Sequence, residues 1–204
     1  MSASVVIVDN GGANTASLRF ALERLAAKSV LTADADAIGA ATHVILPGVG
    51  AARDSMSRLR ARGLDTVIPR LTQPVLGICL GMQLLYQFSE EGASGKGGIP
   101  CLGAIPGTAR RLRPAPGRPV PHMGWNRVRL ARRSALLAGV GDGAHAYFVH
   151  SYALPFGRET VASTEYGEEL SAVIAHRNFF GTQFHPERSA ETGALILRNF
   201  LGLG

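Results

Sequence analysis

Cys79 stands between two glycines in the segment GICLG (77–81), where an extended apolar run meets residues that favour a helix. This Gly-x-nucleophile-x-Gly pattern is typical of a nucleophile elbow, a strained strand-to-helix turn that projects the reactive side chain. A cysteine at a helix start is favoured as thiolate by the helix dipole and free N–H groups. The Leu80 N–H would then face an oxyanion forming on a substrate carbonyl. A buried structural cysteine beside packing glycines explains the five residues equally well.

A thiolate nucleophile needs a base, and the base needs an orienting partner. Glu187 lies two residues after His185 in the segment FHPER (184–188). In an extended segment such residues share one side, with Cα atoms roughly 6.5 to 7 Å apart, so a carboxylate reaches the imidazole. Pro186 between them favours that extended shape. Such a pair is often only a surface pair, but with Cys79 it supplies nucleophile, base and orienting group.

The segment LPGVG (46–50) follows an apolar run that is typical of a strand. A Gly-Val-Gly loop can turn its amides toward a developing oxyanion, which makes Val49 and Gly50 candidates for an oxyanion hole. An ordinary strand-to-helix turn is the alternative.

The elements that must position these groups alternate in the first half of the chain. A length of 204 residues with 46% hydrophobic residues fits one domain, residues 1–204. Alternating elements predict a three-layer α/β fold, with a mostly parallel central sheet flanked by helices. The expected order is strand 4–9, a helix from 14, a weak strand near 30, strand 42–47, a helix through 56 and 59, strand 74–79 and helix 80–88.

Beyond residue 92 the pattern changes to short strands separated by turns rich in glycine and proline. The predicted strands are 146–153, 160–166, 171–176 and 179–185, and a helix over 190–201 follows them. We expect these strands to extend the same sheet in antiparallel fashion. The arginine-rich turn at 110–120 is expected to be a mobile surface loop.

The net charge is +6, from 21 basic and 15 acidic residues, and nearly all the positive charge is arginine. The excess lies in 109–118 and 127–133, which lack interleaved aromatic residues and nucleic-acid motifs. This favours a solvated face or a protein interface over nucleic-acid binding. No apolar run is long enough for a membrane span, and the first residues are typical of a strand rather than a signal peptide. We therefore expect reduced cysteines and a cytoplasmic location.

Three motifs in this order, PGVG (47–50), GICLGMQ (77–83) and FHPE (184–187), resemble those of the class I (triad) glutamine amidotransferases. Further segments, PHMGWNRV (121–128), YFVHSYA (147–153) and QFHPERS (183–189), are similar to the glutaminase subunits of imidazole glycerol phosphate synthases. The resemblance covers essentially the whole chain. It departs at Thr15, where an apolar residue is commoner, which affects the partner surface rather than the chemistry.

The resemblance implies a flavodoxin-like scaffold on which Cys79 attacks the side-chain amide of glutamine, His185 moves the proton and Glu187 orients His185. It implies a heterodimer with a cyclase subunit, a (β/α)8 barrel, which uses the ammonia to make imidazole glycerol phosphate and aminoimidazole carboxamide ribotide in histidine biosynthesis. It implies no metal and no cofactor. The other implied residues are Val49, Gly50 and Leu80 for the oxyanion hole, Gln83, His150, Ser151 and Tyr152 for glutamine, and Asn14, Trp125, Asn126, Tyr147 and Arg188 for the partner.

Three alternatives stay open at this point. A cysteine-dependent hydrolase or redox protein on a related scaffold would share the elbow, but such proteins commonly place histidine after the cysteine, where this chain has Leu80. A non-catalytic binding subunit would have no need of the complete triad. A glutaminase partner for another synthase, such as the one that makes anthranilate, is distinguished by the PHMGWN segment.

Overall fold

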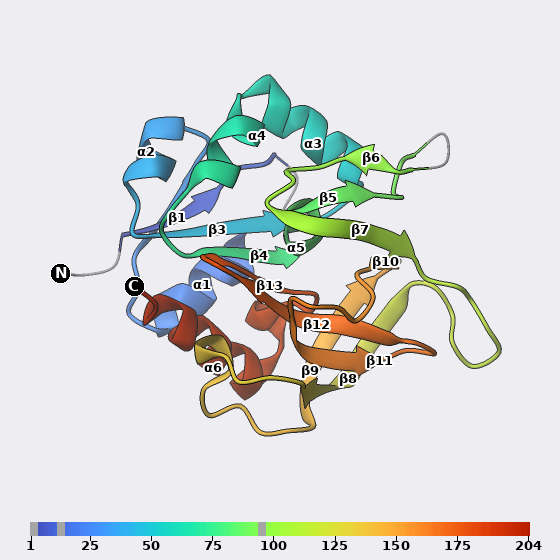
Figure 1. Cartoon of the computed structure of the whole chain (residues 1–204). Coiled ribbons are helices and arrows are strands. Elements are labelled where there is room, and N and C mark those ends of the chain that lie inside the picture. Colours follow the sequence, from blue (N-terminus) through green and yellow to red (C-terminus); the bar gives the residue numbers. More distant parts are fainter. Residues whose placement is uncertain (1–3, 12–14, 94–96) are drawn as a thin grey trace.

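The structure is a computed structural model, and it describes residues 4–11, 15–93 and 97–204. Its centre is a sheet of nine strands in the order β2-β1-β3-β4-β13-β12-β11-β8-β9 (Figure 1). The first five strands of this order run parallel to one another, and the pairings from β13–β12 onward are antiparallel. The strands are β1 Val5–Val8, β2 Ser29–Thr32, β3 His43–Gly48, β4 Val75–Cys79, β8 His122–Leu130, β9 Ala144–His150, β11 Thr160–Glu165, β12 Glu169–His176 and β13 Phe179–Thr182.

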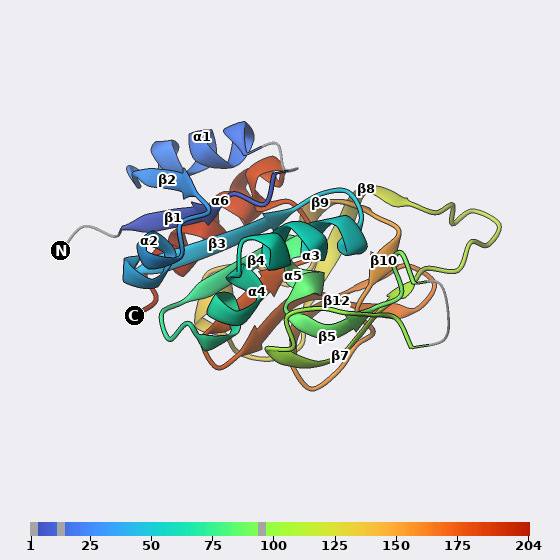
Figure 2. The same cartoon turned by 90° about the horizontal axis from the view of Figure 1, so that it is seen from above.

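Helices cover both faces of the sheet, as the alternating pattern predicts (Figures 1 and 2). The helices are α1 Ala16–Arg24, α2 Ala35–Ala40, α3 Ala52–Ala61, α4 Leu64–Val67, α5 Leu80–Leu84 and α6 Ala190–Leu201, with 3-10 turns at Ile68–Arg70, Ala135–Leu137 and Pro186–Arg188. Among the described residues, no helix is both long and apolar enough to cross a bilayer.

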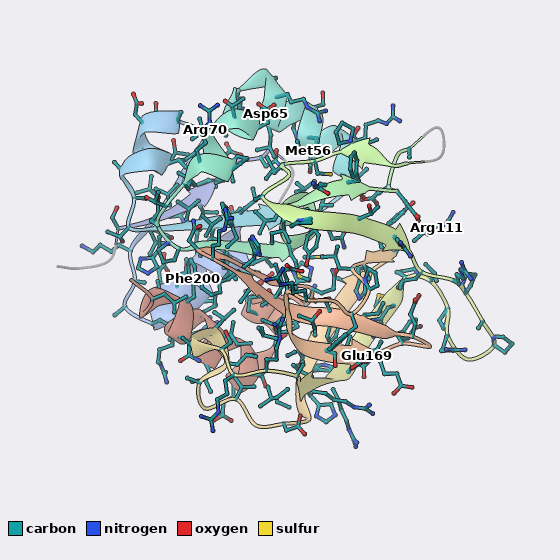
Figure 3. All side chains as sticks on the ribbon, viewed as in Figure 1. Met56, Asp65, Arg70, Arg111, Glu169 and Phe200 are labelled. Carbon is teal, nitrogen blue, oxygen red and sulfur yellow. The ribbon has the colours of Figure 1, made fainter. Side chains whose placement is uncertain are left out.

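Side chains of successive strand residues enter opposite layers of the core, because a strand has a period of two. Val6 of β1 packs in the cluster with Met56 of α3, whereas Ile7 packs in the cluster with Phe200 of α6. Figure 3 shows Met56 and Phe200 on opposite sides of the sheet. The strands buried on both faces therefore explain the continuous apolar runs of the first half.

The predicted helix over residues 80–88 is wrong in its second part. Helix α5 ends at Leu84, and β5 (Tyr86–Ser89) follows it. The Leu84 carbonyl accepts from Leu102 N–H at 2.9 Å, and the Gln87 carbonyl accepts from Cys101 N–H at 2.8 Å. Residues distant in sequence thus satisfy the backbone groups that a longer helix would have used.

A second sheet of four strands was not predicted from the sequence. Its order is β10-β7-β5-β6, and it contains β6 (Ile99–Pro100), β7 (Ile105–Arg111) and β10 (Tyr152–Ala153) beside β5. The expectation that the second half only extends the central sheet is therefore incomplete. Residues 112–121, which connect β7 to β8, protrude from the body of the molecule (Figure 1) and are mostly exposed. Arg111 lies at the start of this connection (Figure 3).

The three candidate catalytic segments follow three adjacent parallel strands. Strand β4 lies between β3 and β13, with Gly48 opposite Cys79 and Thr182 opposite Ile78. The carboxyl ends of parallel strands meet at one edge of a sheet, where ligands of open α/β folds bind. The nucleophile is therefore central, with the Gly-Val-Gly loop on one side and the His-x-Glu segment on the other.

Candidate active site

The turn at Cys79 is strained, as the sequence predicts for a nucleophile elbow. Cys79 has φ 54° and ψ −113°, a conformation that non-glycine residues rarely adopt. The chain passes itself closely here: a Cβ on Gly81 would lie 1.8 Å from the Leu46 carbonyl oxygen, and one on Gly77 would lie 2.6 Å from the Met82 nitrogen. Glycine at both positions is therefore required for the turn that presents the thiol.

The imidazole of His185 and the carboxylate of Glu187 are in direct contact. His185 Nδ1 lies 2.8 Å from Glu187 Oε1, and both side chains are largely buried. The predicted extended geometry is wrong, because Pro186–Arg188 forms a 3-10 turn. This turn is closed by Arg188 N–H, which donates to the His185 carbonyl at 3.0 Å. The pair predicted from the spacing therefore forms, but on a tighter backbone.

Ser189 fixes this segment to the sheet. Its hydroxyl donates to the His185 carbonyl at 2.7 Å and accepts from the Tyr147 N–H of β9 at 3.0 Å. Helix α6 approaches so closely that a Cβ on Gly193 would lie 1.9 Å from the Pro186 carbonyl oxygen. The sequence showed no signal for this role of Ser189, because its partners come from a distant strand.

The surroundings of His185 favour its protonated form. Burial by itself lowers the pKa of His185, but hydrogen bonds to Cys79 and Glu187 and the negative charges of both groups outweigh it and raise this pKa to about 10. Because Nδ1 is bonded to Glu187, the Nε2–H is the group that faces the sulfur. The arrangement places the Cys79 sulfur beside an imidazole that can move a proton, so the sulfur can attack a carbonyl and the imidazole can then protonate a leaving group.

A cavity of about 310 Å³ adjoins Cys79 and His185. It is lined by every predicted oxyanion and glutamine-binding residue, namely Val49, Gly50, Leu80, Gln83, His150, Ser151 and Tyr152. The structure therefore brings together three segments that are distant in sequence. In the described part of the chain, no group of three or more His, Cys, Asp or Glu side chains is placed to hold a metal ion.

Glu91 also lines this cavity, although it was not predicted as a site residue. Of the described residues that line the cavity, Glu91 is the one carboxylate. Its Oε2 accepts from the Ala52 N–H at 2.9 Å. Burial raises the pKa of Glu91, and the hydrogen bond from Ala52 opposes that rise. A lone glutamate in a turn carries no sequence signal for such a position.

Gln83 lies between the cavity wall and the nucleophile. Its amide nitrogen donates to the Tyr152 carbonyl at 2.7 Å and to Gln183 Oε1 at 3.0 Å. The Gln183 amide nitrogen in turn lies 3.8 Å from Cys79 Sγ. Gln183 is fully buried and was not predicted as a site residue. These contacts connect the strand at Tyr152 to the sulfur.

Three of the residues predicted to face a partner form one surface group. The Arg188 guanidinium lies 4.8 Å from the centre of the Tyr147 ring, and the Trp125 ring is edge-on to Tyr147 at 6.0 Å. Trp125 is 55% exposed. The amide of Asn126 instead bonds to His122 and the Glu165 carbonyl, and Asn14 lies outside the described residues.

Comparisons with known proteins agree with this geometry. The family model described as glutamine amidotransferase class-I matches residues 6–202. The protein named imidazole glycerol phosphate synthase subunit HisH from Xylella fastidiosa (strain Temecula1 / ATCC 700964) is 53% identical over 197 residues, which cover 97% of this chain and 96% of that protein. The protein of the same name from Xanthomonas axonopodis pv. citri (strain 306) has the same identity and coverage.

Solved structures show the same fold at low sequence identity. A putative GMP synthase subunit from Thermoplasma acidophilum has a TM-score of 0.73 at 21% identity, covering 99% of this chain and 94% of that one. A structure described as a glutamine amidotransferase has a TM-score of 0.73 at 20% identity, covering 97% of each chain. Together with the family match and the relatives above, these findings show that the chain belongs to the class-I glutamine amidotransferases, and within them to the HisH subunits of imidazole glycerol phosphate synthase.

Proposed function

We propose that Cys79, His185 and Glu187 hydrolyse glutamine to glutamate and ammonia, and that the ammonia passes to a cyclase subunit bound to this chain. The observation that carries the proposal is the 2.8 Å contact of His185 with Glu187 beside a cysteine held at φ 54° in the same cavity. The names of the relatives support a synthase in histidine biosynthesis as the setting.

In the first half of the reaction, the Cys79 thiolate attacks the side-chain carbonyl carbon of glutamine. The negative charge moves to the carbonyl oxygen, where the Leu80 N–H and an amide of the Val49–Gly50 loop would stabilise it. His185 gives its Nε2 proton to the departing nitrogen, which leaves as ammonia, and a glutamyl thioester remains. Glu187 stabilises the imidazolium before that transfer.

In the second half, neutral His185 takes a proton from water, and the resulting hydroxide attacks the thioester. Glutamate departs and the thiolate is restored, with His185 again protonated. The balance is one glutamine and one water consumed for one glutamate and one ammonia. These steps call for no metal or organic cofactor.

The amino-acid end of glutamine fits the far side of the cavity. Glu91 would hold the ammonium group, because a half-buried carboxylate is stabilised by an adjacent positive charge. The backbone at Ser151 and Tyr152 would hold the carboxylate, and Gln83 keeps that backbone in place through the Tyr152 carbonyl. Residues 150–152 were predicted for this role as a group.

A second cavity of about 460 Å³ suggests the exit for ammonia. It shares Val49, Val149 and His185 with the glutamine cavity and is lined on its other side by Leu18 and Arg188. Arg188 belongs to the exposed group with Tyr147 and Trp125, so the second cavity leads toward the surface that we propose for the cyclase subunit. A heterodimer would therefore receive ammonia before it is protonated in bulk water.

A cytoplasmic location belongs to the same proposal. Neither Cys79 nor Cys101 is in a disulfide, which fits a reducing compartment.

The test uses the complex of the Cys79→Ser chain with its cyclase subunit, assayed with glutamine and with an ammonium salt. We expect loss of the glutamine-dependent reaction and retention of the ammonium-dependent reaction, because the thiol acts only in releasing ammonia. Equal loss of both activities in a folded complex would overturn the proposal. Cys101→Ser serves as the matched control and should leave both activities unchanged.

A further inference from the structure

An unbroken series of hydrogen bonds joins strand β8 to the wall of the glutamine cavity. The Asn126 amide nitrogen lies 3.2 Å from His122 Nε2, and His122 Nδ1 lies 3.0 Å from His150 Nε2. His150 Nδ1 then lies 2.9 Å from the Tyr152 carbonyl oxygen. We call Asn126, His122 and His150 the histidine chain. None of its bonds is needed for the proton transfers at Cys79.

The direction of every bond in the histidine chain is fixed by its two ends. A carbonyl oxygen only accepts, so His150 Nδ1 must carry the hydrogen, and in a neutral ring its Nε2 is then an acceptor. His122 Nδ1 must therefore donate, which leaves His122 Nε2 to accept from the Asn126 amide. That amide nitrogen also donates to the Glu165 carbonyl at 2.9 Å, which fixes its identity as the nitrogen.

Packing holds the two rings in these positions. The His122 ring is stacked between Phe148 at 4.9 Å and Tyr166 at 4.0 Å, measured between ring centres. His122 and His150 are directly opposite each other in the β8–β9 pairing, and both are buried. Asn126 Oδ1 accepts from the Arg127 N–H at 2.8 Å, so both ends of its amide are bonded. The outer end of the histidine chain, at Asn126, is thus held by hydrogen bonds to the backbone, as is the inner end at His150.

The inner end of the histidine chain is bonded to the backbone at residues 151–152. The Tyr152 carbonyl accepts from both His150 and Gln83, and the Ser151 carbonyl accepts from the Leu112 N–H at 2.9 Å. A trans peptide directs its N–H opposite to its carbonyl. The bond to the Ser151 carbonyl therefore fixes the Tyr152 N–H, and the bonds to the Tyr152 carbonyl fix the next unit, which carries the Ala153 N–H. His150, Ser151 and Tyr152 all line the glutamine cavity.

We propose that the histidine chain positions the backbone that binds the amino-acid end of glutamine, and that it does so only as a neutral pair with both rings in the Nδ1–H form. This inference rests on the proposed function, because it assigns glutamine to the cavity. Asn126, His122 and His150 are positioning residues in this view. His122 and Asn126 act through His150 and Tyr152 rather than by touching the substrate.

The electrostatic setting agrees with neutral rings. Burial lowers the pKa of His122 to about 4 and the pKa of His150 to about 3. The titratable groups that act on His150 are His122 and His185, and both disfavour a charge there. A proton added to either ring would place two donors face to face and break the series.

The first test replaces His122 by phenylalanine, which keeps an aromatic ring between Phe148 and Tyr166 but cannot donate to His150. Loss of one buried hydrogen bond of about 0.5–1.5 kcal/mol corresponds to about a two- to twelvefold rise in the KM for glutamine. We expect kcat to change little, and the rate of Cys79 alkylation by iodoacetamide to stay the same. Iodoacetamide has no amino-acid end and does not need the positioned backbone.

His43→Phe is the matched control. His43 is also buried at 6% exposure and also bonded through both nitrogens, to Thr42 and to the Leu203 carbonyl, but it lies away from the cavity. We expect it to lose stability with no change in KM. A KM in His122→Phe that equals the KM in His43→Phe would overturn the inference. If His122→Phe does not fold, Asn126→Ala, at a half-buried position, removes the outer donor and serves the same comparison.

The second test is nitrogen NMR of the imidazole rings in the wild-type protein at pH 7. The expected signature is a neutral Nδ1–H ring for both His122 and His150, and an Nε2–H or charged ring at either would overturn the inference. These outcomes are separate from the fate of the proposed function. Glutamine hydrolysis that survives in Cys79→Ser would overturn the function, whereas an unchanged KM in His122→Phe with an inactive Cys79→Ser would overturn the histidine chain alone.

Discussion

The two ends of the glutamine cavity hold the same type of side chain in opposite states. At the catalytic end, His185 is 9% exposed and its pKa is raised to about 10. Elsewhere His150 lines the cavity and is bonded to His122, which lies behind it. Both are buried to a similar degree, and their pKa values are lowered to about 4 for His122 and about 3 for His150. Burial lowers the pKa of all three rings, so burial by itself does not explain why His185 differs.

The hydrogen-bond partners decide it. His185 lies between the Cys79 sulfur and the Glu187 carboxylate, two groups that carry or accept negative charge. His150 meets a backbone carbonyl and another imidazole, which are neutral. A ring that must deliver a proton needs anionic neighbours, whereas a ring that must hold a backbone in place needs a fixed tautomer. The cavity thus separates proton transfer from substrate positioning.

The largest loss of activity is expected when the proton donor is removed. His185→Ala should lower the kcat for glutamine hydrolysis by at least about 100-fold, because general acid–base catalysis contributes about 10²–10⁴. The measurement is glutamate release by the complex with its cyclase subunit. His122→Phe is the reference, and it should keep its kcat. A His185→Ala variant with near wild-type activity would show that the triad assignment is wrong.

Glu187→Gln should have a smaller effect. It keeps the shape of the side chain but replaces a hydrogen bond between charged groups, which contributes about 1.5–3 kcal/mol, or about 10- to 150-fold in rate. The pKa of His185 should also fall, because a negative charge that raises it is lost. An NMR titration of His185 measures this directly. An unchanged or higher pKa in the variant would contradict the role given to Glu187.

The sequence predicted the catalytic end of the cavity far better than the positioning end. The elbow at Cys79 and the His185–Glu187 pair are local patterns, in which residues a few positions apart determine one another's geometry. Strands buried on both faces also leave a continuous apolar signal, so the parallel pairing of β1 to β4 was predicted correctly. The antiparallel pairing expected for the strand over 179–185 is wrong, because β13 lies parallel to β4.

The remainder depends on contacts between distant residues. Helix α5 stops at Leu84 because residues 101–103 take over the backbone hydrogen bonds, and nothing in residues 80–88 indicates this. Glu91 reaches the cavity through a turn, and His122 meets His150 only once β8 and β9 are paired. Asn126 was predicted for the partner surface from the family resemblance, and that role stays a prediction; the sequence did not predict that its side-chain amide bonds to His122 and to the backbone of β11.

The lowered and raised pKa values predict opposite pH dependences of stability for the two kinds of histidine. For His122 and His150 the folded pKa is below the unfolded value of 6.5, so below pH 6.5 the unfolded chain binds more protons. The free energy of unfolding should fall as the pH drops from about 6.5 toward about 4, approaching about 1.4 kcal/mol per pH unit for each ring. For His185 the folded pKa is raised, so its contribution is present below pH 6.5 and is lost as the pH rises through about 10.

Urea unfolding at pH 7 and pH 5 tests the acid side. His122→Phe should show a shallower loss of stability between these values than the wild-type protein, because one of the two rings is gone. His43→Phe leaves both rings of the neutral pair in place and is the control for removing a buried histidine elsewhere, so the loss should be shallower in His122→Phe than in His43→Phe. The same steepness in His122→Phe and the wild type would show that the pair is not neutral in the folded protein.

The two cysteines also differ in their neighbours. Of the changes considered, replacement of Cys101 should have the smallest effect on glutamine hydrolysis. Burial raises the pKa of Cys101 to about 12, and its sulfur lies 3.8 Å from the Ile99 carbonyl oxygen. The charged groups that act on it are Arg60 and Glu91, whereas Cys79 has the imidazole of His185. Since the thiolate is the nucleophile, Cys101 should not react at neutral pH.

A thiol-alkylating glutamine analogue should therefore label the wild-type protein at Cys79 alone, as read by peptide mass spectrometry. Cys101→Ser should keep its labelling rate and its glutamine hydrolysis, and Cys79→Ser should not be labelled. Iodoacetamide, which lacks the amino-acid end, distinguishes the two possible causes of selectivity. If selectivity came only from glutamine binding, iodoacetamide would label Cys101 as readily as Cys79. We expect it to prefer Cys79, because the fold, and not the substrate, places the imidazole of His185 beside this sulfur and raises the pKa of Cys101 by burial.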